Sequence, residues 1–350
     1  MEIQTPQTPH EIPANDPVSS NRRTSNTFVG LFALACVFFA VSLLSYIYFV
    51  DTYRNAQNIA EEKALSLVPT PQEVVAKKYP QITQLLGNAS LLARSIYVYD
   101  TETGQALYAR NPDTPLPLAS ITKVATALSV MEVLSPDTIV TIPRYLAAPS
   151  SPEHLNKGEI WTIRDVLTFT LVTSSNDGAS YLAETADPYL HAKYPESPAT
   201  STTIWAMNML AKRLGMTSTV FYNPHGLDID ATHAGSYGSA RDVAKMFVYA
   251  ASTSRNLFAG TAEDSLSLTS VDGTHITIHN TDQALGAIPG VIMGKTGLTD
   301  LAGGNLAVVF DLGPGTTPIV AVVLGSTESG RFDDMKKILS AIIQSLHTGQ

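Results

Sequence analysis

Strand-like patterns occur in two groups, one soon after residue 94 and one near the end of the chain, with helical patterns between them. Residues 95–100 and 105–109 are rich in aromatic and apolar residues and flank a Gly-containing turn, which predicts a hairpin. Strand patterns return at three later segments: 291–295, 306–310 and 319–324. A sheet built from both groups must therefore pair early strands with late ones.

Helical spacing of apolar residues marks the middle of the chain and its last part. The middle segments begin near Ala119 and continue at 161–173, 202–214 and 240–251. A final helix is predicted to present one apolar face to the sheet, formed by Phe332, Met335, Leu339, Ile342 and Leu346. Strands at both ends with helices inserted between them predict an α+β fold, an antiparallel sheet flanked by helices plus a helical subdomain.

An uncharged apolar run at residues 28–50 predicts one transmembrane helix, because roughly 23 residues span about 35 Å as a helix. The run is longer than the apolar part of a cleaved signal peptide, so we expect it to remain as an anchor. Basic residues flank the helix on both sides, Arg22 and Arg23 before it and Arg54 and Lys63 after it, so their distribution hardly favours one orientation in the membrane.

The regions around this helix differ in composition. Residues 1–27 are polar and poor in large apolar side chains, which predicts a disordered cytoplasmic tail. Residues 51–92 mix charged helix formers with prolines and are interpreted as a stalk or linker. The remaining residues, 93–350, are predicted to form the globular domain. Arg22 and Arg23 favour an amino terminus inside the cell, which would place this domain outside the cytoplasmic membrane.

The overall composition excludes some classes of protein. A hydrophobic fraction of 44% is typical of a globular domain, and a net charge of -9 gives no electrostatic reason to expect a nucleic acid as partner. The single cysteine, Cys36, cannot form a disulfide within the chain.

Ser120 and Lys123 place a hydroxyl and an amine about one turn apart at the start of a predicted helix. Lys123 can act as a base for the serine if burial and a second cation lower its pKa. The backbone amide of Ser120 at the helix start can point towards an oxyanion. A Ser-x-x-Lys pattern alone has little specificity, because it is expected by chance about once in a chain of this length.

Two further motifs add to this interpretation. Lys295-Thr296-Gly297 closes an apolar strand, and Gly297 lacks a side chain where a substrate backbone would approach. Ser-x-Asn occurs at residues 19–21, 174–176 and 254–256. The second copy follows an apolar helical segment, which makes Ser174 and Asn176 the candidates.

Taken in order, these motifs resemble those of penicillin-binding proteins and serine β-lactamases: residues 117–123, 174–177 and 294–299. Further matches resemble the low-molecular-mass D-alanyl-D-alanine carboxypeptidases in particular: 157–159, 223–228, 239–242 and 301–306. This resemblance implies a β-lactamase/DD-peptidase-like fold. It also implies peptidoglycan stem peptides as substrates and β-lactams as covalent inhibitors.

The resemblance implies a role for each candidate residue. Ser120 would be the nucleophile, Lys123 its base and Ser174 a proton relay towards the leaving amine. Asn176 would orient the substrate amide. The terminal carboxylate would face Lys295 and Thr296 of the third motif, which Gly297 completes, and the amides of Ser120 and Leu298 would form the oxyanion hole.

Arg331 has two interpretations at this stage. Its position after the last strand resembles that of a second carboxylate-facing arginine in some relatives. An exposed arginine at the start of the final helix is the alternative.

Other histidine patterns suggest different chemistry. His225 and Asp228 could belong to a Ser-His-Asp hydrolase, but the chain has no Gly-x-Ser-x-Gly elbow, and the histidine lies in a turn-like sequence that favours a loop-stabilising role. His275 and His279 could share one face of a strand, yet no carboxylate or cysteine cluster joins them. We therefore expect no metal site and no cofactor.

Two alternatives to a carboxypeptidase share the acylation residues. A serine β-lactamase would differ by fast deacylation, and a membrane-tethered sensor of β-lactams or peptidoglycan would stay acylated. The motifs do not distinguish these from a carboxypeptidase.

Overall fold

The computed structural model describes residues 81–143, 154–313 and 317–348. The expected tail, the expected transmembrane helix and most of the expected stalk lie outside these residues. Across the part of the chain that is described, no helix is both long and apolar enough to cross a bilayer.

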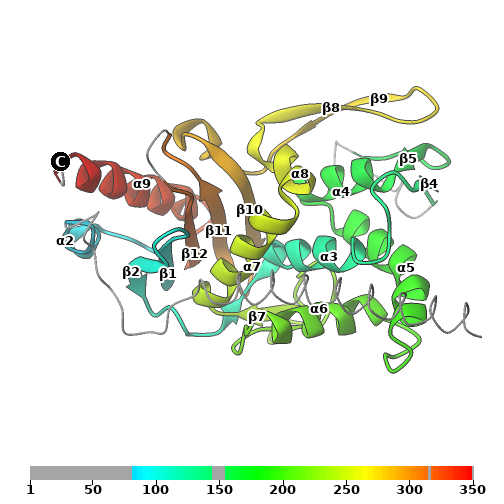
Figure 1. The fold of residues 1–350 in the computed structure, drawn as a ribbon, viewed down its shortest axis with the longest axis horizontal. Helices are drawn as coiled ribbons and strands as arrows, with labels where there is room; N and C mark the ends of the chain where they lie inside the picture. Colours follow the sequence, from blue (N-terminus) through cyan, green and yellow to red (C-terminus); the bar gives the residue numbers. More distant parts are fainter. Residues whose placement is uncertain (1–80, 144–153, 314–316, 349–350) are drawn as a thin grey trace, which may run out of the picture. The chain divides into compact units, whose positions relative to one another are not determined.

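The central element is a five-stranded antiparallel sheet with the strand order β10-β11-β12-β1-β2 (Figure 1). Its strands are β1 (Ser95–Asp100), β2 (Gln105–Arg110), β10 (Val291–Thr299), β11 (Gly303–Phe310) and β12 (Ile319–Ser326). The predicted hairpin forms β1 and β2, and β1 pairs with the last strand, β12. Early and late segments thus share one sheet, as the strand patterns predicted.

Both faces of the sheet are buried. Successive side chains of a strand point to opposite faces, and in β1 this places Tyr97 and Tyr99 in one apolar cluster and Ile96 and Val98 in another. The cluster with Tyr97 and Tyr99 joins the sheet to the helices between β2 and β10. The cluster with Ile96 and Val98 joins it to the helices at 82–88 and 330–348. The sheet is therefore the middle of three layers.

The outer layer on one side consists of α2 (Ile82–Asn88) and α9 (Gly330–Thr348), as Figure 1 shows. Helix α9 packs on the sheet through its predicted apolar face, while α2 buries Ile82 and Leu86 in the same cluster. Helix α2 belongs to the stretch interpreted as a stalk. The compact fold therefore includes residues that precede 93.

The other side holds the helical part: η1 (Ala119–Ile121), α3 (Thr122–Val130), α4 (Ile163–Val172), α5 (Asn176–Lys193), α6 (Thr202–Arg213), α7 (Ala240–Thr253), α8 (Arg255–Phe258) and η2 (Ala259–Ala262). Every residue of α3 is buried, because α4, α5, α6 and α7 surround it. A short turn, η3 (Leu285–Ala287), precedes β10. The long helix α5 was not predicted, since Pro188 lies inside it and proline normally ends a helix.

Short strands complete the fold: β3 (Leu116–Pro117), β6 (Val220–Phe221) and β7 (Ser236–Gly238) in one sheet, the pair β4 (Ile139–Thr141) and β5 (Ile160–Thr162), and the hairpin β8 (Ser265–Thr269) and β9 (His275–His279). Residues 161 and 162, predicted as helical, belong to β5. Thr162 then caps α4 by accepting a hydrogen bond from the amide of Asp165.

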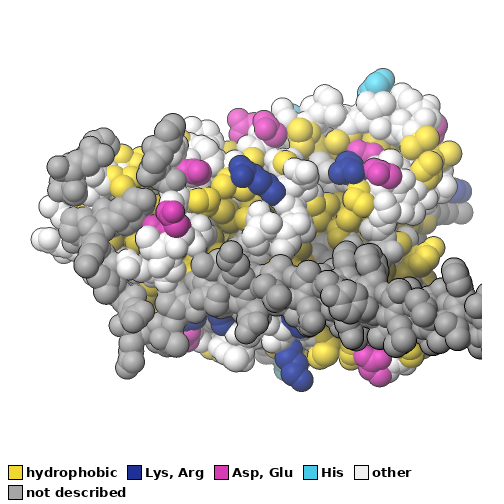
Figure 2. Space-filling model, in the orientation of Figure 1, with side chains coloured by type: hydrophobic (Ala, Val, Ile, Leu, Met, Phe, Trp, Pro, Cys, Tyr) yellow, Lys and Arg dark blue, Asp and Glu magenta, His cyan; other side chains and the backbone are white. Residues whose placement is uncertain are grey.

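Acidic and basic side chains are interspersed among neutral and apolar ones on the face shown in Figure 2.

The carboxylate of Asp334 connects α9 to the start of β1 and to the end of β12. Its oxygens accept hydrogen bonds from the amides of Leu92 (2.9 Å) and Ala93 (2.8 Å) and from the hydroxyl of Ser326 (2.8 Å), and the residue has no exposed surface. We expect Asp334→Ala to lower the free energy of unfolding by about 2–4 kcal/mol in urea denaturation, because these donors lose their buried acceptor.

Asp333→Ala is the matched control, since the neighbouring side chain is 64% exposed. Its expected effect is below about 1 kcal/mol. Equal losses from the two substitutions would contradict a structural role for the Asp334 carboxylate.

Candidate active site

The turn that carries Ser120 lies between β3 and α3. Ser120 is the middle residue of η1, so the nucleophile candidate precedes the α-helix and does not belong to it. Ala119 has a left-handed backbone with φ 50°, which is unfavourable for a residue with a Cβ. The hydroxyl of Thr122 donates to the Ala119 carbonyl at 2.7 Å and holds this turn.

Two neighbouring segments fix the same turn from outside. The side-chain amide of Asn305 on β11 donates to the carbonyls of Pro117 (2.9 Å) and Leu118 (3.0 Å). Gly226 lies so close that a Cβ there would be 1.9 Å from the Ala119 carbonyl oxygen. The turn therefore depends on both the sheet and the 223–228 loop for its shape.

Lys123 lies one turn after Ser120 and is 1% exposed. Its Nζ is within hydrogen-bond distance of three oxygens: Ser120 Oγ (2.7 Å), Asn176 Oδ1 (2.8 Å) and the His225 carbonyl (2.9 Å). Burial, and secondly the nearby charge of Lys295, hold the pKa of Lys123 well below its usual range. A neutral amine can donate to Asn176 and His225 while its lone pair faces the Ser120 hydroxyl.

The Ser-x-Asn turn joins α4 to α5 and sends its two polar side chains in different directions. Ser174 has a left-handed backbone with φ 61°, and its hydroxyl accepts a hydrogen bond from Lys295 Nζ at 2.8 Å. Asn176 begins α5 and faces Lys123. Ser175 between them caps α5 by accepting from the amide of Gly178 at 3.0 Å. The turn therefore contacts both lysines, Lys295 through Ser174 and Lys123 through Asn176.

Lys295 and Thr296 lie on β10, one of the two edge strands of the sheet. Lys295 is 2% exposed, and burial followed by the charge of Arg331 lowers the pKa of Lys295 to about 7, while Asp282 opposes this effect. The hydroxyls of Thr296 and Thr281 lie 2.6 Å apart. Thr281 was not predicted as part of the site.

Gly297 lies against the turn that carries Ser120. A Cβ at this position would lie 2.8 Å from the Leu118 carbonyl oxygen and 3.2 Å from the Ala119 Cβ. The missing side chain thus makes room for the turn that carries Ser120, and it is this chain's own backbone that approaches. Leu298, the next residue, is 42% exposed and lies where β10 passes η1.

The exposed interpretation of Arg331 is wrong. The side chain is 6% exposed, and its Nη1 donates to the Gly297 carbonyl at 2.5 Å. The first turn of α9 contacts the carboxyl-terminal part of β10 through Arg331, so this arginine is buried although it lies at the start of a helix. Arg331 Nε and Asp282 Oδ2 are both buried without a hydrogen-bond partner among the residues described.

His225 and Asp228 stabilise their loop, as one interpretation predicted. The His225 ring accepts a hydrogen bond from the Leu227 amide at 3.1 Å, and burial lowers its pKa to about 4. Asp228 accepts from the hydroxyl of Thr299 (3.0 Å) and the amide of Leu301 (3.1 Å). The loop contributes a backbone carbonyl to Lys123, and a backbone contact leaves no residue-specific signal in a sequence.

His275 and His279 lie at the two ends of β9, and both are exposed. His275 Nδ1 is 2.8 Å from the Thr269 hydroxyl. Within the described ranges, no three histidine, cysteine or acidic side chains are placed to hold a metal ion together.

The sequence profile of the D-alanyl-D-alanine carboxypeptidases matches residues 82–328. The chain belongs to this family. A relative in the family, the D-alanyl-D-alanine carboxypeptidase DacF of Bacillus subtilis, is 30% identical over 267 residues, which are 73% of this chain and 63% of DacF. A second relative, DacD of Salmonella typhimurium, is 31% identical, and the match covers 72% of this chain and 64% of DacD. The chain thus spans less than two thirds of the length of these two relatives.

Solved structures of related proteins share the fold. Penicillin-binding protein D2 of Listeria monocytogenes, in its ampicillin-bound form, matches with a TM-score of 0.60 and 27% identity over 73% of this chain and 99% of that chain. The Streptomyces K15 DD-transpeptidase matches with a TM-score of 0.62 and 26% identity over 73% and 98%. The predicted α+β, DD-peptidase-like fold is confirmed.

The low pKa of Lys295 predicts a pH dependence of stability. The unfolded lysine titrates near 10.5 and the folded one near 7, so the unfolded chain binds more protons between these values and the free energy of unfolding rises with pH. Between pH 7 and pH 9, we expect the free energy of unfolding of the wild-type protein to rise by on the order of 2 kcal/mol more than that of Lys295→Met, as measured by urea denaturation.

Lys336→Met is the control, because that side chain is 46% exposed and should keep the wild-type pH dependence. An unchanged pH dependence in Lys295→Met would show that Lys295 remains charged in the folded protein at pH 9.

Proposed function

We propose that the protein is a serine-type D-alanyl-D-alanine carboxypeptidase that acts on peptidoglycan stem peptides through an acyl-enzyme and is acylated by β-lactams. The observation that carries the proposal is the buried amine of Lys123, 2.7 Å from Ser120 Oγ and held at a lowered pKa. A neutral amine beside a serine hydroxyl is the arrangement that activates a serine for attack.

The reaction begins at the carbonyl of the penultimate D-alanine. Ser120 Oγ forms a bond to the carbonyl carbon while its proton passes to Lys123 Nζ, and the carbonyl becomes an oxyanion near the amides of Ser120 and Leu298. Collapse of this intermediate breaks the carbon–nitrogen bond. The leaving amine takes a proton through Ser174, D-alanine departs, and water then hydrolyses the ester on Ser120.

Substrate orientation is assigned to the remaining site residues. Asn176 is 2.8 Å from Lys123 and would also contact the substrate amide. The terminal carboxylate would lie at the end of β10, facing Lys295 and Thr296. Arg331 supports this end of the strand through Gly297 and adds positive charge beneath it.

The nucleophile assignment is tested with fluorescent penicillin and a pentapeptide that ends in D-Ala-D-Ala. Ser120→Ala should lose both covalent labelling and D-alanine release, because the attacking oxygen that lies beside the Lys123 amine is gone. Ser174→Ala should still be labelled, about 100-fold more slowly, since it keeps the attacking oxygen and loses the relay.

Ser175→Ala is the matched control, because Ser175 lies in the same turn and caps α5. It should label at nearly the wild-type rate. A penicilloyl group found by mass spectrometry on a peptide without Ser120 would sink the assignment. Label lost within minutes would favour a β-lactamase, and a stable adduct without D-alanine release would favour a sensor.

We also propose that the protein is a single-pass membrane protein with residues 51–350 outside the cytoplasmic membrane. The support is the uncharged run at 28–50 and the location of the substrate in the cell wall. Protease added to intact spheroplasts should remove a tag at the carboxyl terminus and leave a cytoplasmic marker protein intact. A tag that is cut only after the membrane is permeabilised would reverse the orientation.

A further inference from the structure

Helix α6 carries a second apolar stripe in addition to its core face. The core face is fully packed through Met207, Leu210 and Ala211. Trp205 and Met209, one turn apart, lie beside this face and remain partly exposed. Trp205 packs partly against the core, and its remaining exposed part lies beside Met209, so α6 presents apolar surface to solvent here.

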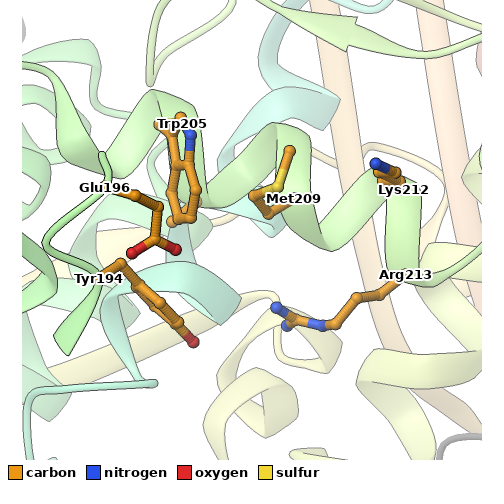
Figure 3. Close-up of a pocket in the computed structure, with 7 residues that line it drawn as sticks. Tyr194, Glu196, Trp205, Met209, Lys212 and Arg213 are labelled. Carbon is orange, nitrogen blue, oxygen red and sulfur yellow. The ribbon is translucent and has the colours of Figure 1, made fainter. Parts of the chain in front are cut away.

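This stripe forms the floor of a pocket of about 440 Å³ between α6 and the end of α5. The pocket is lined by Tyr194, Glu196, Trp205, Ala206, Met209, Lys212 and Arg213. Figure 3 shows Glu196, Tyr194 and Trp205 on one side, Lys212 and Arg213 on the other, and Met209 between them. The size and the mainly apolar lining are typical of sites for small ligands.

The walls of the pocket are held in place by Glu132, which follows α3. Its carboxylate accepts hydrogen bonds from the Tyr194 hydroxyl (2.7 Å), Arg213 Nη2 (2.6 Å) and Lys193 Nζ (3.2 Å). The Tyr194 and Trp205 rings are in contact, with centroids 5.3 Å apart. The aromatic walls therefore exist before any ligand binds, which lowers the entropy cost of binding.

The charges at the rim have opposite signs at the two ends. Glu196 and Lys212 are both exposed, and neither has an ion-pair partner within the described part of the chain. Arg213 adds positive charge beside Lys212 although it is paired with Glu132. An apolar floor with an acid at one end and bases at the other is complementary to a ligand with an ammonium and a carboxylate separated by an apolar segment.

We propose that this pocket binds a short zwitterionic peptide, with the side-chain ammonium of its diamino acid at Glu196, its carboxylate at Lys212 and Arg213, and its methylene groups on Trp205. The proposal rests on the proposed function for the identity of the peptide, which would be a second stem peptide of the same polymer. The mainly helical chain from Ser120 to Glu132, whose carboxylate holds the pocket walls, is roughly 18 Å long. The pocket and the site around Ser120 are therefore separate. A polymer bound at the pocket would raise the effective concentration of its other stem peptides at Ser120.

Tryptophan fluorescence gives a direct readout, because the chain has two tryptophans and Trp161 has no exposed surface. The probe is L-Ala-γ-D-Glu-L-Lys, a tripeptide without the D-Ala-D-Ala bond, titrated into protein pretreated with benzylpenicillin. We expect a saturable change and slower quenching by iodide, and both should be absent in Trp205→Phe.

The charged contacts are tested by pairing each protein variant with a modified probe. Glu196→Gln and Lys212→Met should each weaken binding about 3- to 5-fold. Acetylating the lysine ε-amine of the probe, the amine that stays free when a stem peptide is attached to the polymer, should have a similar effect in wild type and almost none in Glu196→Gln. The controls Glu102→Gln and Lys336→Met change exposed residues elsewhere and should bind as wild type does.

Three results would overturn the proposal: no saturable signal at millimolar tripeptide, equal affinity in the pocket variants, or binding that occurs only without penicillin. Binding of an N-acetylglucosamine oligomer in place of the tripeptide would also overturn it and assign the pocket to a glycan. The penicillin-labelling experiment on Ser120 is independent of this titration, so failure of the proposed function and failure of the pocket are distinguishable.

Discussion

The hydrogen bonds of Lys123 are the interaction on which the arrangement of the site depends. A buried ammonium is costly unless it is paired, and the groups around Lys123 are neutral oxygens with a second lysine nearby. The lysine therefore shifts towards its neutral form and still requires partners for its N–H groups. Those partners come from the turn after β3, from the start of α5 and from the 223–228 loop, so one side chain fixes three distant segments.

The two serines of the site are both associated with an unfavourable backbone. Ala119, directly before Ser120, and Ser174 itself have left-handed conformations, each of which costs on the order of 1–2 kcal/mol for a residue with a side chain. The surroundings maintain this strain through the Thr122 hydroxyl, the Asn305 amide and Lys295. The packing of neighbouring elements thus positions the two hydroxyls, against the backbone preference of Ala119 and Ser174 for negative φ.

The sheet, its final helix and the three motifs could be predicted because each leaves a local signal in the sequence. Apolar residues repeat every two positions in a strand and every three to four in a helix, and the reactive groups of a motif have a fixed spacing. What could not be predicted depends on tertiary contacts. Pro188 hid α5, the burial of Arg331 follows from where α9 meets β10, and Gly297 is required by the approach of Leu118. Asn305 and the His225 carbonyl lie in segments recognised by resemblance, yet their contacts with the site are visible only in three dimensions.

Asn305 also determines when the site can form during synthesis of the chain. Its amide holds the backbone at residues 117 and 118, and its Oδ1 accepts from the Gly325 amide on β12. The order of strands places β12 between β11 and β1, so the early hairpin joins the sheet through the strand made last. A nascent chain that carries Ser120 but not yet β10 to β12 lacks Lys295, Asn305 and the sheet itself. The site therefore cannot be complete before the segment up to Ser326 has been synthesised.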